Sequence, residues 1–279
     1  MISAKIVADS INPTGVRLTT FELEYPRFIL AELNTHRMLS KNSASSRAIP
    51  VERTNQLIKD SPAMPVFWGK NKAGMSATEE LDGIQLESVK AVWLAARDHA
   101  LACSKILGDM QLHKQVTNRI TEPWQTMKSV VTGTEWSNLL WLRNHDAAQP
   151  EFHELARQIQ EAFDSSKPTK LSYDQWHLPY VDDFDLPLDM QIKVSASCCA
   201  QVSYRKTDMS IAKALDIYDR LVGMDRLHAS PFEHQAKPIK MIDGIWPVGV
   251  SHQDRNGQYW SGNFRGWVQY RKTLPNENH

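Results

Sequence analysis

The segment RLTTFELEYPRFILAELNTHRMLSKNSASSR, residues 17–47, sets out a strand, a helix and a polar segment in succession. Residues 17–24 are rich in β-branched and aromatic side chains with partial alternation, which predicts a strand. Pro26 then opens a segment in which apolar side chains such as Ile29 and Leu33 recur at helical spacing. Because proline suits a first helical turn, we expect a helix that runs into His36 and Arg37.

The rest of the chain is predicted to be mainly helical. A capping-box pattern, apolar periodicity and proline at a first turn mark these helices. They cover 76–108, with Gly83 as a candidate break, and 134–143, 150–163 and 210–222. Residues 165–190 are rich in Pro and Asp and predict a long loop or connection. The end of the chain after Pro238 is aromatic and glycine-bearing, so irregular or β structure is expected there, with its aromatic side chains packed. The sum is an α+β fold.

Composition excludes several classes of protein. The 279 residues are 42% hydrophobic and 23% charged, as in an ordinary globular chain, and the formal net charge is zero. A neutral chain lacks the charge of a general nucleic-acid binder, so no nucleic-acid partner is expected. No apolar run has the length of a membrane span, and no signal peptide is recognisable. Three cysteines without a C-x-x-C pair favour a reducing cytoplasm and no structural metal.

The polar segment from Thr35 to Arg47 concentrates chemistry-bearing side chains. It holds an imidazole, two guanidiniums, an amide and several hydroxyls. Such groups can bind a phosphate ester or a flat heterocycle. The same residues would also suit a solvated helix C-terminus followed by a capping loop. On these residues alone, both interpretations stay open.

This segment resembles the signature of the flavin-dependent thymidylate synthases, R-H-R-x-x-S-x-N-x-x-S-x-R. The positions that match are His36, Arg37, Ser40, Asn42, Ser45 and Arg47. Three positions depart from the family: Thr35 stands for an Arg, Glu32 for a Gln, and Ser43 for a Glu. A second block also matches, with Arg119 four residues before a Pro and the pattern N-x-x-x-L-R followed by A-Q-x-E. In this chain the second pattern contains Asn138, Leu142, Arg143, Ala148, Gln149 and Glu151.

A third pair of family motifs lies in an unexpected place. The family begins with A-R-V-S-[FY], a helix and H-x-[ST]-P-F-E-H, upstream of the signature. Here the similar segments are Ala200–Tyr204 and His228–His234, near the C-terminus. The resemblance therefore implies a circular permutation within a single domain of residues 1–279. In that domain, 17–163 would be the family's C-terminal portion, 196–236 its N-terminal portion and 237–279 an added tail.

What the resemblance implies is a central β-sheet flanked by helices and an enzyme that methylates dUMP at C5. The family uses FAD, methylenetetrahydrofolate and NAD(P)H, and it forms homotetramers with shared active sites. The flavin contacts carried over are His36, Arg37, Asn138, Ser203, His228 and Ser230. The nucleotide contacts carried over are Glu32, Ser43, Ser45, Ser46, Arg47, Arg119 and Arg143, with Arg143 and Ser45 as the catalytic pair.

The departures open two alternatives. An ionised carboxylate only accepts hydrogen bonds, so Glu32 would suit the amino group of cytosine better than O4 of uracil. The enzyme would then methylate or hydroxymethylate dCMP or a related pyrimidine nucleotide. Alternatively, loss of an Arg at Thr35 and a Glu at Ser43 would fit a relative that binds flavin or nucleotide without catalysis. A zinc site at His228, Glu233 and His234 is disfavoured because the spacing is not H-E-x-x-H.

Overall fold

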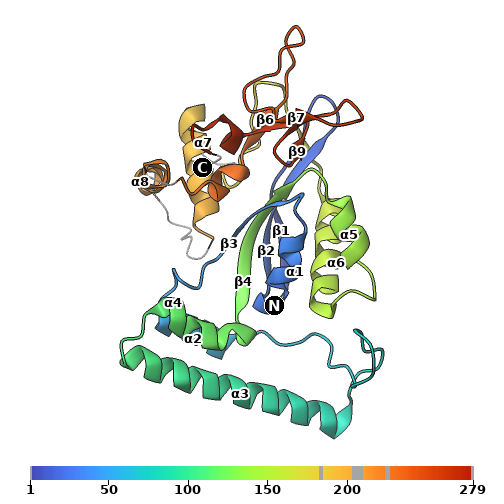
Figure 1. Cartoon of the computed structure of the whole chain (residues 1–279), viewed down its shortest axis with the longest axis vertical. Coiled ribbons are helices and arrows are strands. Elements are labelled where there is room, and N and C mark those ends of the chain that lie inside the picture. Colours follow the sequence, from blue (N-terminus) through green and yellow to red (C-terminus); the bar gives the residue numbers. More distant parts are fainter. Residues whose placement is uncertain (1, 182–184, 203–209, 224–226, 278–279) are drawn as a thin grey trace.

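The computed structural model describes residues 2–181, 185–202, 210–223 and 227–277. Its centre is a five-stranded mixed sheet in the order β3-β4-β2-β1-β5 (Figure 1). The strands are β1 (Ser3–Ile11), β2 (Arg17–Pro26), β3 (Ser40–Ser43), β4 (Thr126–Gly133) and β5 (Thr169–Lys170). β5 pairs in parallel with β1 and the other pairs are antiparallel. The fold is therefore α+β, as the sequence predicts.

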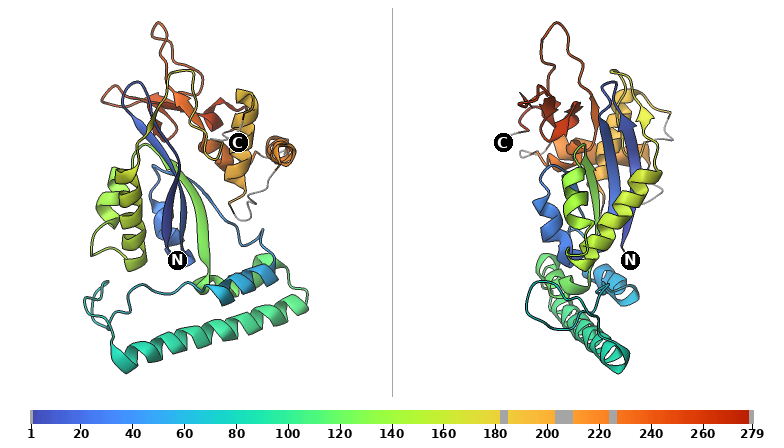
Figure 2. Two further views of the ribbon diagram at one scale, coloured as in Figure 1. Left: turned by 180° about the vertical axis from the view of Figure 1, so that it is seen from behind. Right: turned by 90° about the vertical axis from the view of Figure 1, so that its right-hand side faces the viewer.

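One face of the sheet carries the main apolar core. It is covered by α1 (Leu30–Thr35), α5 (Ser137–Arg143) and α6 (Pro150–Ser165), which lie beside the sheet in Figures 1 and 2. Alternate residues of β2 point into this core, which also takes in the apolar sides of the three helices. Its largest fully buried side chains are Phe21, Leu23, Tyr25, Ile29, Leu33, Leu139, Phe152 and Leu155.

The other face is covered by later parts of the chain. α7 (Leu188–Ala200) packs Cys199 against Val130 of β4, and α8 (Ile211–Val222) packs against α7. The C-terminal residues form β6 (Ala236–Pro238) with β10 (Trp267–Gln269), and the small sheet of β7 (His252–Gln253), β8 (Tyr259–Ser261) and β9 (Phe264–Arg265). Trp267 is fully buried against the start of β2.

A chain of buried polar side chains crosses this second face. The Oγ1 atoms of Thr20 and Thr132 are 2.8 Å apart, and each is 2.8 Å from a histidine nitrogen, Nε2 of His177 and Nδ1 of His234 respectively. Nδ1 of His177 lies 2.9 Å from Oγ of Ser10. Burial lowers the pKa of each histidine to about 3, so both are neutral near pH 7.

A third group of helices lies beyond one end of the sheet, at the bottom of Figure 1. It contains α2 (Val51–Asp60), α3 (Gly83–Asp109), α4 (Lys114–Thr117) and the 3-10 helix η2 (Asn118–Trp124). α3 packs against α2 and η2, and most of its surface is exposed. Among the described residues, no helix has both the length and the apolar character needed to cross a bilayer.

Several predicted boundaries are confirmed and others need correction. The strand at 17–24 is β2, and the helices predicted at 150–163 and 210–222 are α6 and α8. The helix predicted from residue 76 begins only at Gly83, because Asp82 is extended and Gly83 has φ +50°. Of the five strands of the central sheet only β2 was predicted, and the helices α2 and α7 were not predicted. Leu142, an apolar residue of the helix predicted at 134–143, is 44% exposed.

Candidate active site

Arg143, at the end of α5, contacts two other residues that the sequence assigns to the site. Its Nη1 is 2.8 Å from Oε2 of Glu32 on α1, and its Nε–H donates to Nε2 of His36 at 3.1 Å. The guanidinium carbon also lies 4.8 Å from the ring centre of Phe152 on α6. Three groups therefore contact this guanidinium: a carboxylate, an imidazole and an aromatic ring.

The environment of His36 sets its charge and tautomer. Burial first, and then the nearby charges of Arg143 and Lys41, lower the pKa of His36 to about 4. The imidazole is therefore neutral near pH 7. Because Nε2 accepts the hydrogen bond from Arg143, the ring proton lies on Nδ1. His36 thus offers an N–H donor, and not an acceptor, on its remaining edge.

The amide of Asn42 joins three segments that are far apart in the sequence. Its Nδ2 donates to the carbonyl oxygen of Cys199 on α7 at 2.5 Å. Its Oδ1 accepts from the hydroxyl of Ser230 at 3.2 Å, at the start of the 3-10 helix η3 (Ser230–Glu233). The segments 196–202 and 228–234 therefore pack against the signature segment within one chain, as the sequence predicts.

A second set of predicted residues lies beyond the other end of β3. Asn118, fully buried at the start of η2, donates through Nδ2 to the carbonyls of Ser46 and Ile49 at 2.7 and 3.0 Å. The loop that carries Ser45, Ser46 and Arg47 is thereby fastened to η2, which also carries Arg119. Ser45, Arg47 and Arg119 are exposed, and Ser46 is buried. This loop and Arg119 form a hydroxyl- and guanidinium-bearing surface.

The remaining predicted residues fall into different environments. Arg37, Asn138 and His228 are exposed. Ser43 is half-buried, and its Oγ lies 2.7 Å from Oγ of Ser129, which places it in a hydrogen-bonded chain with the sheet. Ser203 lies outside the described residues.

The residues of the disfavoured zinc alternative have other partners. The carboxylate of Glu233 forms an ion pair with Arg271, and Nδ1 of His234 lies 2.8 Å from Oγ1 of Thr132. These contacts turn the two side chains to different neighbours, and His228 is exposed.

Two residues of the cluster were not assigned a role from sequence. Phe152 has no polar atom and follows the matched A-Q-x-E block by one position, so only its packing under Arg143 reveals it. Lys41 occupies an unspecified position of the signature, yet its ammonium donates to the carbonyls of His36 and Leu39. Asn42 was recognisable, because it matches a fixed position of the signature.

The outer surface of α5 is partly apolar. Trp141 and Leu142 are 76% and 44% exposed, and Asn138 is exposed on the same side of α5. Three cavities of about 620, 560 and 510 Å³ are lined by other residues, and none of the three includes Arg143 or His36. Glu32 and Arg143 are thus partly exposed at the surface of the isolated chain, whereas His36 beside them is buried.

No model of a known protein family matches the chain, and no curated protein sequence matches it. Among solved structures, it is similar to the flavin-dependent thymidylate synthase ThyX from Helicobacter pylori complexed with FAD and dUMP. That similarity has 18% identity and a TM-score of 0.39, and it covers 52% of this chain and 67% of that one.

Two structures of the UMP/dUMP methylase PolB from Streptomyces cacaoi, bound with 5-Br dUMP and 5-Br UMP, are also similar. Each has 15% identity and covers 58% of this chain, with 90% and 88% of the other chain and TM-scores of 0.49 and 0.48. The chain is thus similar, at low identity and over part of its length, to a ThyX thymidylate synthase and to a UMP/dUMP methylase.

Proposed function

We propose that the chain is an FAD-dependent enzyme that methylates a pyrimidine nucleotide, dUMP, at C5. Methylenetetrahydrofolate would supply the carbon and NAD(P)H the reducing equivalents, as the resemblance implies. The observation that carries the proposal is the Arg143 guanidinium, held between Glu32 and the neutral His36 over Phe152. An anion-stabilising group fixed before the ligand arrives is what a reaction with developing negative charge requires.

The residues at this surface fit a flavin. FAD combines an apolar ring with hydrogen-bonding edges and a negatively charged diphosphate. The chain offers apolar surface at Trp141, the Nδ1–H donor of His36 and the exposed guanidinium of Arg37. Asn138, His228 and Ser230 would add polar contacts, and Ser203 belongs to the same carried-over set. When bound, FAD would supply the hydride transfer that no side chain can perform.

The chain's own side chains would bind the nucleotide and stabilise charge on it. Arg143 would lie at the pyrimidine edge and offset negative charge as C5 becomes nucleophilic. Arg47 and Arg119 would hold the phosphate through charge-assisted hydrogen bonds, with the hydroxyls of Ser45 and Ser46 beside them. In this assignment Ser45 and Arg143 are the catalytic pair, and Ser43 supports the pocket wall through Ser129.

The two parts of the proposed site lie at opposite ends of β3, which spans roughly 13 Å at its four residues. A mononucleotide bound at one end of β3 would not reach the residues at the other end. Its remaining contacts would therefore come from another copy of the chain. We therefore propose a homotetramer with shared sites. The permuted order of 17–163 and 196–236 within one domain, with 237–279 as an added tail, belongs to the same proposal.

Trp141→Glu is expected to break this assembly. Trp141 is 76% exposed on α5, so the substitution leaves the core of the monomer unchanged. A buried, unpaired carboxylate at an apolar contact would instead oppose association. Light scattering after size exclusion should show tetramers for the wild-type chain and smaller species for the variant. If both the wild-type chain and the variant form tetramers, Trp141 does not lie at the contact between subunits.

The function is tested directly on the purified protein. Visible absorbance would report bound flavin, and turnover of dUMP with methylenetetrahydrofolate and NADPH would report the reaction. Flavin without turnover of any pyrimidine nucleotide would support the non-catalytic alternative. Absence of both flavin binding and turnover, after incubation with FAD, would contradict the proposal.

Glu32 supports a second candidate, methylation or hydroxymethylation of dCMP. Its carboxylate is 38% exposed and lies beside the Arg143 guanidinium, so an acceptor and a donor stand next to each other. An acceptor there suits the amino group of cytosine. Parallel assays with dUMP and dCMP separate the candidates, because turnover of dUMP alone removes the second one.

His228→Ala is expected to weaken flavin retention without preventing nucleotide binding. His228 is exposed two residues before Ser230, whose hydroxyl binds Asn42 in the signature strand. Equilibrium titration with FAD should show at least a tenfold weaker affinity. His99→Gln, at an exposed position on α3, is the matched control and should retain flavin normally. Unchanged FAD affinity in His228→Ala would remove this residue from the flavin set.

A further inference from the structure

Lys41 lies on the edge strand β3, directly after the turn that carries His36 and Arg37. The half-buried ammonium donates to the carbonyl of His36 and, at 2.9 Å, to that of Leu39. His36 is the C-cap residue of α1. Carbonyls at a helix end have no partner within the helix, and among the described residues that of His36 accepts only the backbone amide of Leu39, at 3.3 Å, besides the ammonium of Lys41. The Lys41 ammonium donates to the carbonyls at the two ends of the turn, those of His36 and Leu39.

We propose that Lys41 is a positioning residue, whose charged side chain holds the turn of His36–Leu39 in the geometry that binds the ligand. This inference rests on the proposed function, since it assigns the turn a role in binding flavin and nucleotide. Lys41 itself would not touch the ligand. It would act through His36, whose imidazole receives the hydrogen bond from Arg143.

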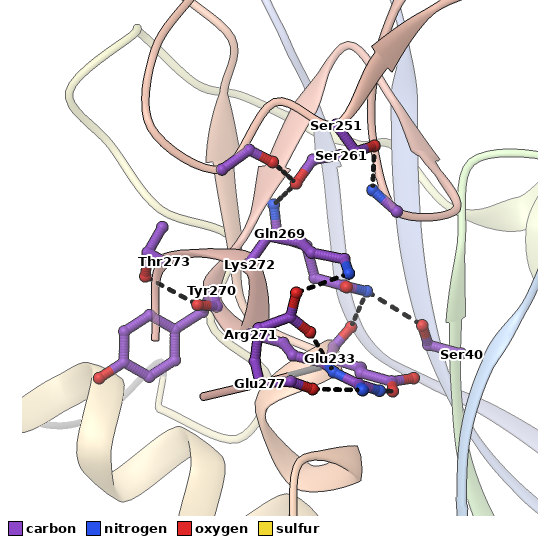
Figure 3. A network of polar contacts seen from close by, with 12 residues as sticks. Ser40, Glu233, Ser251, Ser261, Gln269, Tyr270, Arg271, Lys272, Thr273 and Glu277 are labelled. Atoms are coloured by element: carbon purple, nitrogen blue, oxygen red, sulfur yellow. Dashed lines mark hydrogen bonds and ion pairs between the residues drawn. The ribbon is translucent and has the colours of Figure 1, made fainter. Parts of the chain in front are cut away.

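The C-terminal segment keeps a carboxylate near Lys41. Glu233, at the end of η3, interacts electrostatically with Lys41 in the direction that favours its charged form. Glu233 is held by Arg271, and Arg271 is held in turn by Glu277 at 2.9 Å, as Figure 3 shows. Ser40, the residue before Lys41, receives a hydrogen bond from Gln269 at 3.1 Å. Residues of the added tail therefore bind Ser40, the neighbour of Lys41 in the chain, and Glu233, whose carboxylate acts on Lys41.

The charge of Lys41 is sensitive to pH in a useful range. Burial lowers the pKa of its ammonium from 10.5 to about 8, against the opposing effect of Glu233. Of the other groups around it, His36 has a pKa lowered to about 4 and stays neutral from pH 7 to 9. Two guanidiniums lie on its neighbours, that of Arg143 on His36 and that of Arg271 on Glu233. Raising the pH through 8 therefore removes the positive charge of Lys41 and weakens its hold on the two carbonyls.

The first test measures hydrogen exchange at the backbone amides of His36 and Leu39. These amides donate to the carbonyls of Leu33 and His36 respectively, so they report whether the turn is formed. Lys41→Met should lower their protection factors by at least tenfold at pH 7. In the wild-type chain the protection should fall between pH 7 and 9. In Lys41→Arg it should stay constant, because an arginine does not lose its proton there.

Lys128→Met is the matched control on the neighbouring strand. Lys128 is half-exposed on β4 and its ion pair with Glu24, at 3.5 Å, is remote from the turn. This variant should keep the wild-type protection and its pH dependence. Should Lys41→Met fail to fold, the comparison of the wild-type chain with Lys41→Arg across pH 7–9 gives the same information. Protection that is unchanged in Lys41→Met, or equally pH-dependent in Lys41→Arg, would overturn the proposal.

The second test measures FAD affinity by equilibrium titration on the same proteins. A positioning role predicts an affinity at least tenfold weaker in Lys41→Met, and an alkaline weakening in the wild-type chain that Lys41→Arg abolishes. Loss of protection with unchanged FAD affinity would make Lys41 merely structural and overturn the proposal. If no variant binds FAD, the proposed function fails, whereas the exchange data still decide whether Lys41 fixes the turn.

Discussion

Arg143→Ala should lower nucleotide turnover by about a hundredfold while leaving FAD bound. A lost electrostatic stabiliser at a water-poor site typically costs two to three orders of magnitude in rate, on the order of 3 kcal/mol in the barrier. Arg143 is positioned for such a role by Glu32, His36 and Phe152 before any ligand binds. Steady-state assays at saturating nucleotide, with the flavin spectrum recorded on the same sample, measure both quantities.

The variant should remain folded. The guanidinium contributes a cation–π contact and a partly exposed ion pair, each worth about 1 kcal/mol or less. Arg143→Lys is expected to restore little activity, because an ammonium cannot reproduce the simultaneous contacts of Nε and Nη1. Arg157→Ala is the control, since Arg157 forms its ion pairs with Glu154 and Glu161 on the exposed side of α6. It should keep wild-type turnover.

The titration of His36 gives an independent check on the same variant. The charge of Arg143 is one of the causes that lower the pKa of His36 to about 4. Removing that charge should raise the pKa of His36, as nuclear magnetic resonance of the imidazole would show. Full turnover in Arg143→Ala, or loss of flavin with turnover per bound flavin unchanged, would overturn the role given to Arg143.

Local sequence signals predict the elements whose burial is periodic. The strand at 17–24 and the helix from Pro150 each bury one regular face, so their apolar residues repeat at the period of the element. β3 has the sequence SKNS and contains no apolar residue. It is a strand because β4 offers it an open edge, which is a tertiary cause. α7 is buried along most of its length, so its sequence shows no amphipathic stripe.

The candidate site also contains contacts that the sequence predicts and contacts that it does not. The approach of 228–234 to the signature strand was predicted because a family resemblance gave both segments a place in one site. The contact of Ser230 with Asn42 agrees with that adjacency. The pairing of Arg143 with Glu32 and His36 could not be derived from spacing, because it depends on how α5 lies against α1. Lys41 was missed because its partners are backbone carbonyls, which no side-chain motif records.

Acidification from pH 7 to pH 5 should strongly destabilise the fold. The pKa values of His177 and His234 are lowered to about 3, and that of His36 to about 4, in each case mainly by burial. In the unfolded chain a histidine has a pKa of about 6.5. Each folded-state pKa lies below the unfolded one, so this stability is complete above pH 6.5. It is lost as the pH falls through the window from about 6.5 toward 3.

The size of the effect follows from linkage. At pH 5 an unfolded histidine is mostly protonated, whereas the three buried ones stay neutral in the folded chain. Each therefore lowers the free energy of unfolding by about 2 kcal/mol, or about 6 kcal/mol together. This is comparable with the whole stability of a typical domain, about 5–15 kcal/mol. Urea unfolding followed by tryptophan fluorescence at pH 7, 6 and 5 measures the loss.

His177→Gln separates this cause from general acid effects. Glutamine can still hydrogen-bond to Ser10 and Thr20, although the variant is less stable than the wild-type chain at pH 7. Because glutamine takes up no proton, the variant loses less stability on acidification. Between pH 7 and pH 5 the free energy of unfolding should fall by about 2 kcal/mol less in the variant than in the wild-type chain. His99→Gln, at an exposed position on α3, is the matched control for the same substitution. A wild-type free energy of unfolding that is equal at pH 7 and pH 5 would contradict the buried, neutral state of these histidines.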